Sequence, residues 1–231
     1  MTSEKEIKDL IDTYEPCMLE NIKTILDKET NLEKTFNEEE DTLLTYCVRN
    51  DKYDLVELLL EKNVNIHHQD KDGNNALLIS ICKGRNLDML FLLLEHGSDV
   101  GHQNKIGDNA LFMSIKTINA VEIVKSVLEH GANVNQYNDE GQTPLLFAIK
   151  HASFPVVENL IEHGANVNQR NLNGEFPLAQ ALQTIHKKPD VLEYLLITGA
   201  NINIIDKDYS YLYEKIDKET IKLINSFRKF N

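Results

Sequence analysis

Residues 139–168 read DEGQTPLLFAIKHASFPVVENLIEHGANVN, a stretch with two short apolar segments separated by a polar break. The second segment, from Val156 to Ile161, places apolar side chains at the three- and four-residue spacing of one helix face. It stops at Gly164, and glycine readily takes the left-handed conformation that ends helices. The stretch therefore predicts a pair of short helices that share a core.

The end of this stretch returns at a regular interval. HGANV at 163–167 is matched by HGSDV at 96–100, HGANV at 130–134 and TGANI at 198–202. The glycines of these segments are 34, 33 and 35 residues apart: Gly97, Gly131, Gly164 and Gly199. A second glycine series has steps of 34, 34 and 33 residues: Gly73, Gly107, Gly141 and Gly174. Two series with one period indicate an internal structural repeat.

The residues between the two glycine series are also alike. A short apolar helix is predicted at 76–81, 110–115, 144–149 and 177–182, and an amphipathic helix follows each. The apolar stripes of these second helices are Leu87, Leu90, Leu93 and Leu94; Val121, Val124, Val127 and Leu128; Val156, Val157, Leu160 and Ile161; and Val191, Leu192, Leu195 and Leu196. Among these, Leu93, Leu128 and Ile161 are predicted to fill equivalent core slots.

This pattern resembles the ankyrin repeat, a unit of about 33 residues with a β-turn and two helices. The likeness covers roughly residues 37–208 and implies an all-α ankyrin-repeat solenoid, in which helix–turn–helix repeats carry β-turn or hairpin tips. In the first repeat, Glu40 and Asn63 stand where the others have glycine. The histidine that usually follows Pro-Leu in the family is absent. The predicted division is an N-terminal capping repeat (1–36), five ankyrin repeats (37–69, 70–103, 104–137, 138–170 and 171–205) and a C-terminal capping repeat (206–231).

The composition limits the kinds of partner. Acidic residues outnumber basic ones 37 to 24, which gives a formal net charge of −13. This balance argues against nucleic acid and anionic membranes, which are bound through Lys and Arg. We expect neither a membrane-spanning segment nor a secretory signal, because no apolar stretch has the length that either requires. The odd number of cysteines (Cys17, Cys47 and Cys82) favours reduced thiols in the cytoplasm, and Cys47 falls at a predicted core position.

No catalytic, cofactor-binding or metal-binding motif is recognisable. His96, His130 and His163 recur at the repeat period. They should therefore lie on the order of 10 Å apart, too far to share a metal ion. We predict that each supports the carbonyl groups at a helix C-terminus. The pair His67 and His68 is expected on a solvated surface.

The resemblance implies that turn tips and the inner faces of the first helices line a concave, partner-binding groove. The predicted tips carry many acids, Glu38, Glu39, Glu40, Asp41, Asp72, Asp108, Asp139, Glu140 and Glu175, beside Lys71 and Lys105. The ends of the first helices carry one base each: Arg49, Lys83, Lys116 and Lys150. Two interpretations stay open: the two rows neutralise each other and keep the protein soluble, or they form a groove for a basic, extended segment.

We therefore predict a monomeric, cytoplasmic, non-catalytic module that binds another protein with a basic surface, as an adaptor, inhibitor or immunity-type antidote. No cofactor or metal is expected. The predicted partner-binding residues are Glu39, Asp41, Asp72, Asn74, Lys83, Asp108, Lys116, Asp139, Glu140, Gln142, Lys150 and Glu175. Phe112 is either an exposed anchor or a core ring. Three alternatives remain: a microbial effector delivered into a host cytosol to act on a host protein, an enzyme with an unrecognised site, and a self-associating structural repeat.

Overall fold

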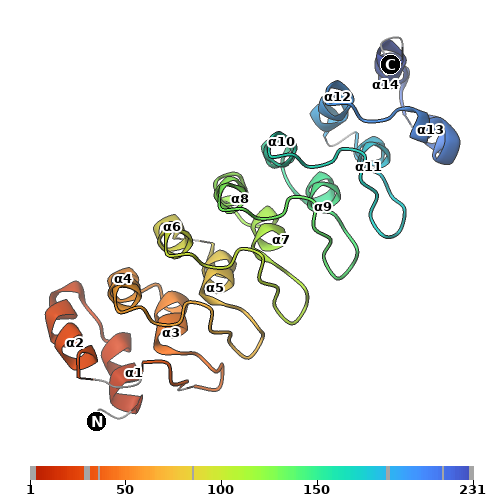
Figure 1. The fold of residues 1–231 in the computed structure, drawn as a ribbon. Helices are drawn as coiled ribbons and strands as arrows, with labels where there is room; N and C mark the ends of the chain where they lie inside the picture. The colour runs from red at the N-terminus through yellow and green to blue at the C-terminus, as the bar shows by residue number, and fades with distance from the viewer. Residues whose placement is uncertain are drawn as a thin grey trace. The chain divides into compact units, whose positions relative to one another are not determined.

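The computed structural model describes residues 4–28, 32–35, 37–84, 86–185, 188–214 and 216–228 (Figure 1). Over these residues the chain forms helices joined by turns, without a strand. The prediction of an all-α fold is confirmed. The chain divides into two compact units, Met1–Met113 and Ser114–Asn231, which we describe in turn.

The first unit is built from short helices that pack in pairs. Within it, α3 packs against α4 and α5, α5 packs against α6, and α2 packs against α4. Figure 1 shows long turns that project from this unit on the side of α3 and α5. The helices are α1 (Glu4–Asp12), the 3-10 helix η1 (Pro16–Met18), α2 (Leu19–Leu26), α3 (Leu43–Arg49), α4 (Tyr53–Glu61), α5 (Ala76–Lys83) and α6 (Leu87–Glu95), and α7 (Ala110–Ile115) spans the boundary between the units.

The second unit repeats this arrangement. Its second helices pack in a row, α8 on α10 and α10 on α12, and its first helices form another, α9 on α11 and α11 on η2. The last helix, α14, packs against α12. The elements are α8 (Ala120–Glu129), α9 (Pro144–His151), α10 (Phe154–Glu162), α11 (Pro177–Gln183), α12 (Pro189–Ile197), α13 (Asn203–Asp208), the 3-10 helix η2 (Ser210–Glu214) and α14 (Lys218–Phe227).

The first helices begin at residues whose side chains cap them. Asn75 Oδ1 accepts a hydrogen bond from the backbone N–H of Leu78 at 3.0 Å, and Asn109 and Thr143 serve α7 and α9 in the same way. Such a cap satisfies a donor that the first helical turn leaves free. The first helices therefore start where the sequence predicts, while α5 and α9 extend two residues further than predicted, to Lys83 and His151.

One fully buried position of each second helix lies four residues before the left-handed residue that follows the helix (Asn63, Gly97, Gly131, Gly164 or Gly199). The side chains at this position are fully buried in every repeat: Leu59, Leu93, Val127, Leu160 and Leu195. The predicted set was therefore wrong for two repeats, because Leu128 and Ile161 lie one residue later. One residue turns a helix by about 100°, so these side chains point toward the edge of the core. Ile161 is accordingly only half-buried.

The positions of the two glycine series all have a left-handed backbone, as predicted; Asp51 and Gly84 are left-handed as well. Gly73 and Gly97 both have φ of 79°, and the residues that replace glycine in the first repeat, Glu40 and Asn63, have φ of 59° and 56°. Residues other than glycine rarely take this conformation, since it brings Cβ close to the following carbonyl oxygen. The prediction that Glu40 and Asn63 occupy glycine positions is confirmed.

We expect Gly73→Ala to destabilise the first unit by about 2 kcal/mol or more, and Gly97→Ala by only about 1 kcal/mol. Both substitutions place alanine at a positive φ, but a Cβ at residue 73 would lie 2.9 Å from the backbone nitrogen of Lys105. A Cβ at residue 97 would meet nothing within 4 Å. Denaturant unfolding of the two variants measures the difference, and equal losses would contradict a close contact between the two turns.

Candidate functional site

Each long turn is shaped by one Asn or Asp side chain. Asp70 Oδ1 accepts hydrogen bonds from the backbone N–H groups of Asp72 and Asn74, at 2.9 and 2.8 Å. The equivalent first residues, Asn37, Asn104, Asn138 and Asn171, likewise accept from the N–H group four positions on. The side chain thus replaces water as the partner of the buried turn backbone. The two residues that follow it project from the tip.

Backbone hydrogen bonds also connect successive turns within each unit. In the first unit, the N–H of Lys71 donates to Glu39 O at 2.9 Å, and that of Lys105 donates to Asp72 O at 3.0 Å. In the second unit, the N–H of Leu172 donates to Gly141 O at 2.9 Å. The backbone of each of these turns therefore has a fixed register with its neighbour, independent of the side chains at the tip.

Asp41 does not lie at an exposed tip, as the sequence analysis expected. Its carboxylate is completely buried and accepts two hydrogen bonds from the Arg49 guanidinium, both at 3.0 Å. Arg49 Nη2 also donates to Asp70 Oδ2 at 2.8 Å, so one cation joins the carboxylates of two successive turns. Burial alone would raise the pKa of Asp70, but hydrogen bonds from the Asn74 backbone and from Arg49 hold it below its ordinary value. Asp41 is therefore part of the turn scaffold.

Several other predicted site residues are held by internal contacts. Lys71 Nζ lies 2.8 Å from Glu39, and Lys150 Nζ lies 3.2 Å from Glu175. Lys116 Nζ lies 4.6 Å from the centre of the Phe147 ring, at the distance of a cation–π contact. These contacts favour, for these residues, the interpretation that the acidic and basic rows neutralise each other.

Two predicted polar residues belong to the scaffold in the same way. Asn74 Oδ1 accepts a hydrogen bond from Asn104 Nδ2 at 2.9 Å, and Gln142 Oε1 lies 3.5 Å from Asn171 Nδ2. Both side chains are half-buried, and so is Asp108. Their position within the turns leaves them less accessible than the tip residues.

A third set of predicted residues is exposed. The side chains of Asp72, Asp139 and Glu140 project from the tips, and Lys83 lies exposed at the end of α5. Within the described parts of the chain, none of these four forms an ion pair. The structure thus separates the predicted acidic residues into those that the fold uses and those that it leaves to solvent.

Two exposed apolar residues of the tips were not among the predicted site residues. Ile106 in the first unit and Leu172 in the second are 72% and 73% exposed. Ile106 occupies the position of Asp72 and Glu140 in other turns, and Leu172 occupies the position of Lys71 and Asp139. This contrast between apolar and charged residues is visible when the repeats are compared. Phe112, considered as an anchor, is only 1% exposed and belongs to the core. The hypothesis of an exposed aromatic anchor at Phe112 is therefore wrong.

The family follows from a comparison over most of the chain. The model of ankyrin repeats (3 copies) matches residues 14–104, 44–138, 81–171 and 111–206. The chain is an ankyrin-repeat protein. An ankyrin repeat domain from Acinetobacter baumannii AYE, solved by crystallography at 1.00 Å resolution, is 26% identical, with a TM-score of 0.75 over 86% of this chain and 100% of that one. No curated protein gives a significant match. Ankyrin repeats are generally protein–protein interaction modules.

The periodic histidines of this ankyrin-repeat protein support helix ends, as predicted. The Nδ1 atoms of His96, His130 and His163 lie 2.9, 2.8 and 2.8 Å from the carbonyl oxygens of the residues four positions earlier. His68 was expected to be solvated, but it is half-buried, and its Nε2 lies 2.7 Å from Glu40 O. His102 makes the equivalent contact with Gly73 O at 2.7 Å. In both repeats, the histidine ring thus contacts the backbone carbonyl of the left-handed residue of the preceding turn.

The remaining chemically active side chains of this ankyrin-repeat protein are dispersed. Cys47 is buried in the core, as predicted, and burial raises the pKa of its thiol. Cys17 and Cys82 are exposed. Among the described residues, no three His, Cys, Asp or Glu side chains are grouped so that they could hold a metal ion. In the same residues, no helix has the length and apolar character needed to cross a membrane.

Proposed function

We propose that the chain binds another protein through the exposed tips of its turns. The observation that supports this proposal is that some residues of each turn hold its backbone and others only face solvent. The first residue and the left-handed residue shape the turn, while the two between them project into solvent, as Asp139 and Glu140 do. Side chains that do not stabilise the fold are available for recognition, and ankyrin repeats generally bind proteins.

The chemistry of the tips favours a partner with a basic surface that also offers apolar contacts. In the first unit the tips present Asp72 and Ile106, and in the second they present Asp139, Glu140 and Leu172. Carboxylates attract and orient a basic partner, and a buried aliphatic side chain adds affinity at short range. We treat the tips of the two units as separate patches, and we exclude Asp41 because it is buried.

Around these patches, the exposed Lys83 completes the proposed surface, whereas Glu39, Lys116, Lys150 and Glu175 are already engaged in internal contacts. A module that presents such a surface acts as an adaptor, an inhibitor or an immunity-type antidote. We propose that it works as a monomer in the cytoplasm. An effector that enters a host cytosol would use the same surface on a host protein.

Reversing the charge of the tips should slow association with the partner. For a partner recovered from the native organism and then purified, we expect Asp72→Lys and the pair Asp139→Lys with Glu140→Lys each to lower the association rate. The salt dependence of that rate should also become weaker, because the screened long-range attraction is reduced. Stability should change by less than about 0.5 kcal/mol, since these side chains make no core contact. Stopped-flow measurements over a salt series provide the rates.

Matched controls are available on the second helices. Glu61 and Glu193 are exposed carboxylates of α4 and α12, one in each unit. Reversing either to lysine changes the net charge as much as the Asp72 variant does, but leaves the tips intact. If these controls slow association as strongly as the tip variants, the effect reflects net charge alone, and the proposed surface is wrong.

A further inference from the structure

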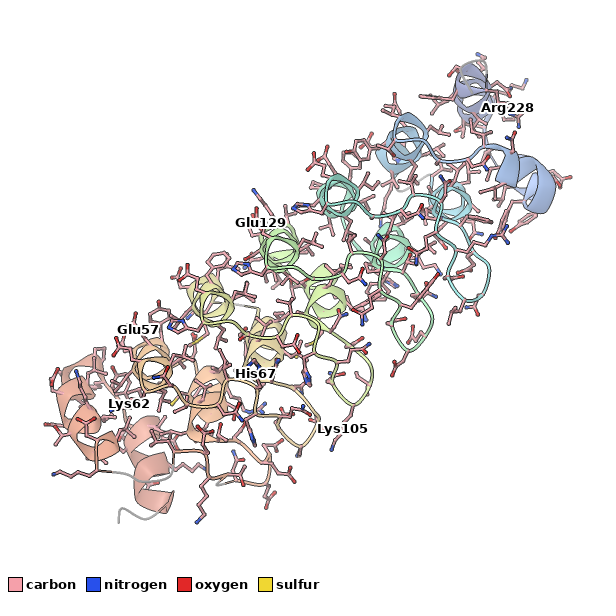
Figure 2. All side chains as sticks on the ribbon, in the orientation of Figure 1. Glu57, Lys62, His67, Lys105, Glu129 and Arg228 are labelled. Atoms are coloured by element: carbon pink, nitrogen blue, oxygen red, sulfur yellow. The ribbon has the colours of Figure 1, made fainter. Side chains whose placement is uncertain are left out.

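The outer side of the first unit carries a hollow that the turns do not form. It is an open hollow, continuous with solvent, between the second helices α4 and α6. Its lining residues are Tyr53, Asn86, Asp88, Phe91, Leu92 and Glu95. Figure 2 shows Glu57 on α4, on the side of the second helices, whereas Lys105 lies at a turn tip. The hollow therefore belongs to a different face from the proposed binding surface.

Aromatic side chains form the apolar part of the hollow. Phe91 is 36% exposed and Tyr53 is half-buried. Phe91 lies six residues before Gly97, and the equivalent positions of the other repeats carry charged residues: Glu57, Lys125, Glu158 and Glu193. Phe91 therefore stands at a position that the other repeats fill with a charge. Together with Tyr53 it gives the hollow two aromatic rings that are open to solvent.

The rim of the hollow is negatively charged. Glu57, Asp88 and Glu95 are exposed, and within the described residues no lysine or arginine forms an ion pair with them. Partial burial, followed by the negative charges of Glu57, Asp88, Glu95 and Asp54, raises the pKa of the Tyr53 hydroxyl. One polar lining group is already used, because Asn86 donates to Asp51 and accepts from the N–H of Met89. The free carboxylates and the rings therefore define what the hollow can bind.

We propose that this hollow binds an arginine side chain of a protein partner. A guanidinium group is planar, so it stacks on a ring such as that of Phe91 while its N–H groups pair with a carboxylate. A lysine ammonium would meet the negative rim, but it offers no flat face for the ring and no paired donors for one carboxylate. The proposal concerns a second contact area, and it does not depend on the turn surface.

The test uses the full chain and a small probe, the peptide acetyl-Gly-Arg-Gly-amide. In a nuclear magnetic resonance titration we expect saturable shifts of the Phe91 and Tyr53 ring signals and of the Asn86 side-chain amide. The dissociation constant should be on the order of 1–10 mM, as for a single weakly held side chain. The same peptide with citrulline, which has nearly the same shape but no charge, should bind at least about tenfold more weakly.

Variants locate the peptide. Phe91→Ala should weaken binding roughly two- to fivefold, as expected for loss of an exposed cation–π contact, and Asp88→Asn with Glu95→Gln should weaken it further. Glu61→Gln, an exposed carboxylate of α4 outside the hollow, should leave it unchanged. The proposal is overturned by equal binding of the citrulline peptide, by an equal effect of Glu61→Gln, or by the absence of saturable shifts. Shifts confined to Asp72 and Ile106 would also overturn it, while leaving the turn surface as the basic-partner site.

Discussion

Replacing Arg49 with methionine should lower the free energy of unfolding of the first unit by about 3 kcal/mol. The guanidinium is the cation that compensates the completely buried carboxylate of Asp41, and it also contacts Asp70. A buried charge that loses its partner keeps its desolvation penalty. Removing one member of a buried ion pair therefore destabilises a protein more than replacing both members with neutral residues. Denaturant unfolding of the variant measures the loss.

Two comparisons test whether the uncompensated carboxylate charge causes the loss of stability in Arg49→Met. Lys83→Met removes the cation at the end of the first helix of the next repeat, one position after the equivalent of Arg49; Lys83 is exposed, and the change in stability should be less than about 0.5 kcal/mol. Adding Asp41→Asn and Asp70→Asn to Arg49→Met should recover more than half of the loss, because neutral amides leave no charge uncompensated. A loss below about 1 kcal/mol for Arg49→Met, or no recovery in the triple variant, would contradict this account.

The pH dependence of the same cluster has a defined sign. The pKa of Asp70 is lowered in the fold, so its ion pair and hydrogen bonds stabilise the protein above the ordinary carboxylate pKa. This contribution is lost as the pH falls through the lowered value. The difference between wild type and Arg49→Met should therefore shrink in acid, where a protonated carboxyl group no longer needs the cation.

Leu160→Ala should destabilise the second unit by about 2–5 kcal/mol, and Ile161→Ala by clearly less. Leu160 is completely buried in α10, which packs against both α8 and α12, whereas Ile161 is half-buried. Leu160→Ala leaves a cavity and removes contacts on all sides. The smaller space left by Ile161→Ala can be filled by water and neighbouring side chains.

Hydrogen exchange shows where the damage falls. After Leu160→Ala, protection should decrease most in α8, α10 and α12, because these helices share the truncated position. Larger effects from Ile161→Ala than from Leu160→Ala would restore the register that the sequence analysis predicted and refute the one found in the structure.

The repeat pattern sufficed for the fold because it combines two kinds of information. Glycines at left-handed positions mark where helices and turns end, and apolar spacing marks which helix face is buried. Even Glu40 and Asn63 were placed correctly, from the period alone. The register within the second helices was harder, because two adjacent apolar residues such as Val127 and Leu128 both fit the stripe, and only packing shows which one lies deeper.

The candidate site was predicted less completely. Asp41 and Asp72 are both acids near a turn, and the sequence does not show that Arg49 reaches back eight residues to one of them. The exposed Ile106 and Leu172 were not predicted, because the site was predicted from charged residues and apolar residues were assigned to the core. The burial and the ion pairing of a side chain depend on the direction in which it points, and the sequence pattern does not specify this direction.

The turn architecture has an evolutionary consequence. Because Asn104 and Gly107 determine the shape of their turn, the intervening Lys105 and Ile106 can be exchanged without altering the backbone that carries them. Under the proposed function, substitutions at these two sites change recognition at little cost in folding stability, because neither side chain shapes the turn.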